Sequence, residues 1–114
     1  MNTFDERDID NLLAILDHCD RIASTYERID RSLETFKNDP DYRDAILMNI
    51  VQIGEAANRL SDDCRGKLNE LPWHSIIGIR NIIVHGYIKI DDLIMWDIIE
   101  NDIPVLKQRI EGVV

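Results

Sequence analysis

The sequence predicts an all-α fold, an up-and-down bundle of four to five helices. Apolar residues recur at three- and four-residue steps along most of the chain, which is the period of one helix face. No segment alternates apolar and polar residues between Asn-Gly or Asp-Gly turns, as a β-hairpin would. Hydrophobic residues make up 45% of the chain, which is too many for a disordered protein.

Length and composition limit the classes of function. With 114 residues, we expect one domain spanning residues 1–114. The net charge of −9 argues against a non-specific nucleic-acid binder, which would normally be basic. No apolar run approaches the ~20 residues of a membrane span, and the acidic N-terminus does not resemble a signal peptide. Cys19 and Cys64 lie far apart without CxxC spacing. We therefore expect a cytoplasmic protein with no membrane association, disulfide framework, metal site or cofactor.

The first half of the chain predicts two long helices. An apolar stripe indicates a helix over about residues 5–27. A short helical piece follows at 30–36 and ends before Pro40, which suits the first turn of the next helix. That helix spans about 40–61 and contains Gly54. Because glycine costs up to about 1 kcal/mol in a helix interior, Gly54 predicts a close contact with another helix.

The second half predicts a loop and two more helices. The loop runs from 61 to Pro72, and a helix from 73 to 85 follows, with Gly86 placed to cap its C-terminus. The last helix covers about 91–111 and carries two apolar stripes. Since a helix that is apolar on two sides needs a second partner, this pattern suggests a dimer interface. Pro104 should kink the last helix by removing one backbone bond.

Arg80 and His85 are the strongest candidates for catalysis. They lie five positions apart in an apolar run of isoleucine and valine, where buried polar groups are costly. An arginine can hold a phosphate with its planar donors, and a histidine can transfer protons near neutral pH. This pairing suits phosphodiester cleavage without a metal. From the spacing alone, an ordinary structural pair that bridges helices is equally compatible.

The helix period separates Arg80 from His85, whereas Asn81 shares a face with His85. Two arrangements could still bring Arg80 and His85 to one phosphate. The helix could fray at Gly86 and turn His85 inward, or two protomers could face each other across a cleft. We favour the second, because it also accounts for the apolar excess of the last helix.

The remaining polar residues have simpler interpretations. Tyr87 is either exposed beside the motif or a hydrophobic plug, and Lys89 either adds charge near the site or is a solvated lysine. Glu55 and Arg59 are four apart and are predicted to pair on the helix surface. His18 lacks a metal partner at the right helical spacing.

Four segments together resemble HepT-like HEPN proteins. Arg80-Asn81-x-x-x-His85-x-Tyr87 is similar to the Arg-x4-His-x-Tyr motif of these proteins, which are the toxins paired with MNT-type minimal nucleotidyltransferases. The other similar segments are an Ile-Gly-Glu-Ala block at 53–57, a Pro-Trp lead into the motif at 71–81, and the last helix at 96–106. The resemblance covers about residues 45–110.

The resemblance implies a type VII-like toxin–antitoxin component, a homodimeric endoribonuclease that needs no metal and cuts RNA, tRNA among the targets. Arg80 would polarise the scissile phosphate, His85 would transfer protons, and Asn81 would orient the phosphate or His85. Lys89 is a candidate RNA contact. The nucleotidyltransferase antitoxin would neutralise the toxin by transferring AMP from ATP to Tyr87. Two other classes remain open: a non-catalytic nucleotide- or RNA-binding partner of a nucleotidyltransferase, and a purely structural helical dimer.

Overall fold

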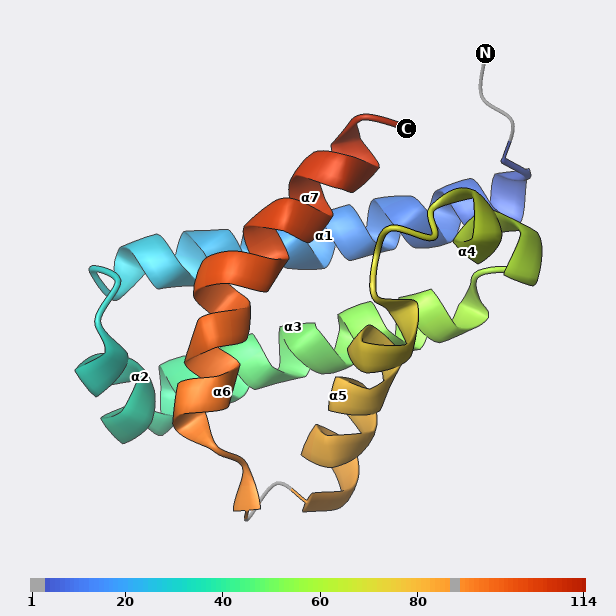
Figure 1. The fold of residues 1–114 in the computed structure, drawn as a ribbon. Helices are drawn as coiled ribbons and strands as arrows, with labels where there is room; N and C mark the ends of the chain where they lie inside the picture. Colours follow the sequence, from blue (N-terminus) through green and yellow to red (C-terminus); the bar gives the residue numbers. More distant parts are fainter. Residues whose placement is uncertain (1–3, 87–88) are drawn as a thin grey trace.

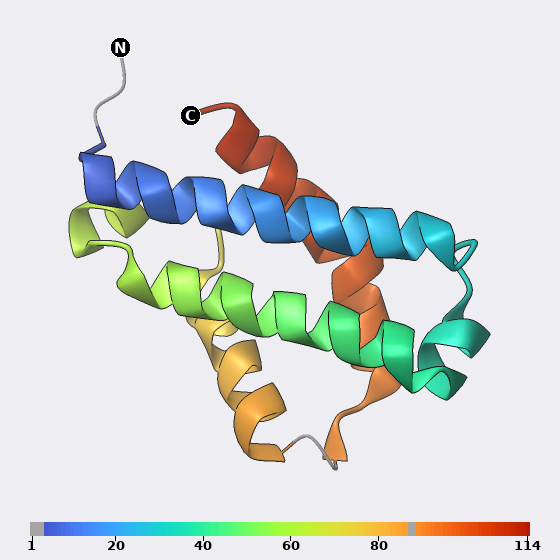
Figure 2. The same cartoon turned by 180° about the vertical axis from the view of Figure 1, so that it is seen from behind.

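The chain forms two layers of helices around a shared core. The computed structural model describes residues 4–86 and 89–114. Helices α1 (Glu6–Arg28) and α3 (Pro40–Arg59) lie side by side and run in opposite directions. Helix α5 (Trp73–Gly86) and the C-terminal helices cover one side of this pair, as Figures 1 and 2 show from opposite sides. The part of the chain that the structure describes contains helices and no strand, which confirms the predicted all-α class.

The helix boundaries follow local signals in the sequence. Asp5 begins α1 and Asp39 begins α3, each accepting a backbone N–H of the first turn with its side chain. Pro40 occupies the first turn of α3, as predicted. The short helix α2 (Leu33–Asn38) connects α1 to α3. These boundaries agree with the predicted ones to within two or three residues, because caps and apolar periodicity are both local.

The predicted loop after α3 was wrong in part. Residues Asp62–Lys67 form a short helix, α4, whose N-cap is Ser61. Ser61 accepts the backbone N–H of Cys64, while Asp8 on α1 accepts both the N–H and the hydroxyl of Ser61, at 2.9 and 2.6 Å. The carboxylate of Asp8 is buried there. A helix of six residues is too short for apolar periodicity to reveal it.

The last helix is a column of three segments with a wider turn in the middle. Helix α6 (Asp92–Asp97) continues into the π-helical segment η2 (Ile98–Asp102) and then into α7 (Ile103–Glu111). The N–H of Ile103 bonds to the carbonyl of Ile98, five residues back. Pro104 follows directly and has no N–H to donate. The expected irregularity at Pro104 is therefore a π segment, and the column changes direction there (Figure 1).

One hydrophobic cluster joins the two layers. It includes Leu12 and Ile15 from α1, Ile46 from α3 and Ile110 from α7, all fully buried. Cys19 and Cys64 are both buried and are not joined by a disulfide. Burial raises the pKa of the Cys19 thiol to about 12. Among the described residues, no helix has the length and apolar character needed to cross a membrane.

Candidate functional site

Arg80 lies at a close contact between α5 and α3. A Cβ atom added to Gly54 would overlap the Cβ of Arg80 and lie 3.1 Å from its Cγ. The same Cβ would lie 3.3 Å from the backbone carbonyl oxygen of Ile76, one turn earlier in α5. Only a residue without a side chain permits this approach. The close contact that Gly54 predicted is thus confirmed, and its partner is the arginine of the motif.

The guanidinium of Arg80 is held on two sides. Its Nε donates to Oε1 of Glu55 on α3, forming an ion pair. Its Nη1 donates to Oδ1 of Asn81 at 2.8 Å. About a third of each side chain of the ion pair is exposed, 30% for Arg80 and 32% for Glu55. Arg80 is therefore anchored at its inner edge and reachable by solvent.

Glu55 pairs with a different arginine from the one that its helical spacing predicts. It was predicted to pair with Arg59, four residues later on the same helix. Instead it pairs with Arg80, and Arg59 donates from Nε to Oδ1 of Asn11 on α1 at 3.0 Å. The neighbouring residue Gly54 already indicated that another helix contacts α3 at this point. The sequence did not reveal which helix would arrive there.

His85 lies on a different side of α5 from Arg80. Helix α5 continues to Gly86, so His85 remains in the helix, and its side chain is exposed. Five residues of α-helix turn the side-chain direction by about 140° and advance it by about 7.5 Å. The alternative in which the helix frays and turns His85 inward is not what the structure shows. A single chain does not bring Arg80 and His85 to one point.

The other candidate residues lie outside the contact between Gly54, Glu55 and Arg80. Gly86 closes α5 without the left-handed backbone of a glycine cap, because no described glycine has a positive φ. Tyr87 lies outside the described residues. Lys89 is exposed. His18 has its Nδ1 2.8 Å from Oδ1 of Asn49, a contact that joins α1 to α3.

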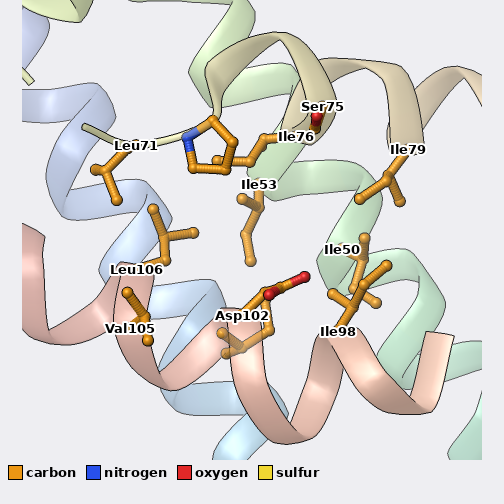
Figure 3. A pocket seen from close by; sticks show the side chains of 12 residues that line it. Ile50, Ile53, Leu71, Ser75, Ile76, Ile79, Ile98, Asp102, Val105 and Leu106 are labelled. Carbon is orange, nitrogen blue, oxygen red and sulfur yellow. The ribbon is translucent and has the colours of Figure 1, made fainter. Parts of the chain in front are cut away.

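An apolar groove opens beside the motif helix. It encloses about 150 Å³ between α3, α5 and the C-terminal column, with Ile53, Ile76 and Leu106 among its walls (Figure 3). Ser75 and Asp102 are its polar members. Asp102 extends its carboxylate toward the middle of the groove (Figure 3). Burial and the nearby charge of Asp97 raise the pKa of this carboxyl.

Comparison with known proteins identifies relatives across most of the chain. A protein of Methanocaldococcus jannaschii, provisionally named an RNase, is 36% identical over 76 residues, covering 67% of this chain and 70% of its own length. A protein of Caldanaerobacter subterraneus with the same kind of name is 30% identical over 99 residues, covering 87% of each chain. The "Probable ribonuclease HepT" of Thermococcus cleftensis is 28% identical over 100 residues, covering 83% of this chain and 91% of its own. No solved structure shows a significant match.

The family model described as "Ribonuclease HepT-like" matches residues 15–113. This span contains α3, the motif helix α5 and the whole C-terminal column. It also contains the contact between Gly54, Glu55 and Arg80. The chain belongs to the Ribonuclease HepT-like family.

Proposed function

We propose that this protein is the ribonuclease toxin of a toxin–antitoxin pair, acting in the cytoplasm as an endoribonuclease that needs no metal. The observation that carries the proposal is the anchored, solvent-accessible guanidinium of Arg80. Arginine has five N–H donors, and two of them are engaged by Glu55 and Asn81. The remaining donors suit the oxygens of a phosphodiester. Family membership supports the same reaction class.

The proposed reaction uses the RNA itself as the nucleophile. The 2′-hydroxyl oxygen attacks the adjacent phosphorus and loses its proton to water, while the bond from phosphorus to the 5′ oxygen breaks. Arg80 stabilises the charge that develops on the phosphate oxygens. His85 donates a proton to the leaving 5′ oxygen. The products are a 2′,3′-cyclic phosphate and a 5′-hydroxyl end.

We propose further that the active form is a homodimer with the two motifs facing a shared cleft. In one chain, Arg80 and His85 point to different sides of α5, so a second copy can supply the missing partner. Several large apolar side chains on α5 and the C-terminal column are exposed: Ile82, Val84, Leu93, Ile94 and Val105. Large exposed apolar side chains are often part of interaction surfaces. They support the predicted role of the motif helix and last helix in dimerisation.

Regulation is proposed to act on Tyr87 through a partner nucleotidyltransferase of the MNT type. The tyrosine hydroxyl attacks the α-phosphorus of ATP and releases pyrophosphate, which leaves AMP attached. Each AMP adds bulk and negative charge beside the cleft, and negative charge repels RNA. Incubation with the cognate enzyme and ATP should add the mass of AMP to the wild-type chain. The Tyr87→Phe variant should remain unmodified, and equal modification of both chains would contradict the assignment.

Growth and RNA integrity after induction in a bacterial host test the proposed activity. Wild type should arrest growth and fragment RNA, with tRNA among the candidate targets. Arg80→Ala and His85→Ala, produced in equal soluble amounts, should do neither. Normal growth and intact RNA with wild type would refute the nuclease. The remaining function would then be that of a nucleotide- or RNA-binding partner of a nucleotidyltransferase.

A further inference from the structure

We propose that Glu55 is a positioning residue for the nuclease reaction. Gly54 and Glu55 form what we call the Arg80 seat, which fixes the direction of the catalytic guanidinium. This inference rests on the proposed ribonuclease function and adds a residue to it from a different helix. It assigns a role to a carboxylate that, by charge alone, should repel RNA.

The backbone half of the seat sets where the side chain of Arg80 begins. Gly54 lets the Cβ and Cγ of Arg80 lie directly against the α3 backbone. The approach is so close that a methyl group at position 54 would overlap them. The first atoms of the arginine side chain are thus packed against α3. This contact restricts a flexible side chain before any hydrogen bond is made.

The carboxylate half of the seat sets which edge of the guanidinium is exposed. Glu55 accepts from Nε, the donor nearest the chain, and Asn81 accepts from one N–H of Nη1. Among the residues that the structure describes, no partner contacts the second N–H of Nη1 or either N–H of Nη2. Those groups form the outer end of the planar fork, which pairs with two phosphate oxygens at once. Glu55 therefore occupies the edge that a phosphate does not need.

An arginine that is already held in one direction loses less conformational entropy on binding a phosphate than a free arginine does. The side chain of a free arginine carries rotamer entropy, which binding to a phosphate would have to remove. A guanidinium already fixed in direction loses less, and small errors of position cost large factors in rate. Loss of the seat should therefore act mainly on kcat. Loss of the negative charge alone should favour RNA binding and lower KM.

Steady-state cleavage of one oligoribonucleotide by three variants separates these effects. Glu55→Gln keeps an oxygen that can accept from Nε and removes the charge, so kcat should stay near the wild-type value while KM falls. Glu55→Ala removes the acceptor, and kcat should fall by about tenfold to a hundredfold. Glu70→Ala is the matched control, because it breaks another carboxylate–arginine pair, with Arg109, and should leave both constants unchanged.

The outcomes distinguish failure of this inference from failure of the proposed function. A wild-type protein that cuts no RNA refutes the function, and the role of Glu55 in cleavage falls with it. A wild type that cuts RNA, with Glu55→Ala equally fast or faster, overturns the seat alone. Equal loss of kcat in the Gln and Ala variants also overturns it, since charge rather than direction would then be what matters.

A measurement on the wild-type protein covers the case in which Glu55→Ala does not fold. The Nε–H of Arg80 should give a slowly exchanging NMR signal, assigned by its absence from Arg80→Lys. This signal should persist when a 2′-O-methyl oligoribonucleotide, which cannot be cleaved, is bound. Disappearance of the signal on binding would mean that the phosphate displaces Glu55, and the carboxylate would then be a competitor rather than a positioning group.

Discussion

At the scale of single residues, the absence of a side chain at Gly54 allows Arg80 to pack directly against α3. Gly54 is buried inside a 20-residue helix, where every other residue except proline would be a better helix former. The glycine is needed because helix α5 packs closely against α3 at this position. The arginine that the motif requires is placed by a residue 26 positions earlier in the sequence.

Gly54→Ala should therefore destabilise the fold despite the better helix propensity of alanine. The added methyl overlaps Arg80 and forces α3 and α5 apart, a kind of overpacking that typically costs about 1–3 kcal/mol. Chemical denaturation measures the loss. Gly66→Ala is the matched control, because a Cβ there meets nothing within 4 Å, and it should be neutral or slightly stabilising. Equal stability of the Gly54 variant and wild type would contradict the close contact.

At the scale of helices, α1 does more than pack along α3. Its first turn carries Asp8, and the buried carboxylate of Asp8 binds the residue that begins α4. This contact secures the segment between the two helices that frame the seat. The fold thus depends on a polar contact at one end as well as on the apolar cluster.

Asp8→Ala should lower the free energy of unfolding by about 1–3 kcal/mol, because the N–H and hydroxyl of the half-buried Ser61 lose their charged acceptor. Asp8→Asn should cost less, since an amide oxygen can still accept one of these bonds. Asp10→Ala, an exposed position on the same helix, serves as the control. Denaturation curves that coincide for Asp8→Ala and wild type would show that the contact contributes nothing.

The long helices and the contact at Gly54 could be predicted from the sequence, but the pairing at the site could not. Periodicity and caps are properties of neighbouring residues, so α1, α3 and α5 were expected close to their observed bounds. The choice of Glu55 between Arg59 and Arg80 depends on which helix packs against α3. Spacing along one helix favoured Arg59, and packing between helices selected Arg80.

At the scale of the whole molecule, the positions of Arg80 and His85 on α5 predict how much activity a mixture of two inactive variants should recover. Chains with Arg80→Ala and chains with His85→Ala are each expected to be inactive. If the protein is the proposed homodimer, the two variants, mixed and allowed to exchange, should form heterodimers in which the Arg80 of one chain meets the His85 of the other. Random pairing makes half the dimers mixed, each with one intact site of two, so about a quarter of wild-type cleavage should return.

As a control, either single variant is mixed with the double variant that carries both Arg80→Ala and His85→Ala. No site in these mixed dimers has both an arginine and a histidine. No recovery in the first mixture, with subunit exchange shown by a mass tag, would mean that each chain builds its own site. Light scattering at micromolar concentration checks the premise, because a monomer there would contradict the proposed dimer.

The division of Arg80 and His85 between two sides of one helix has a consequence for timing in the cell. If each centre needs two chains, the amount of active enzyme rises with the square of the chain concentration while dimers are few. The first copies made after induction are then almost harmless. Under the proposed function, toxicity would begin at a threshold rather than in proportion to synthesis, and this delay would leave time for the proposed antitoxin to reach newly made chains.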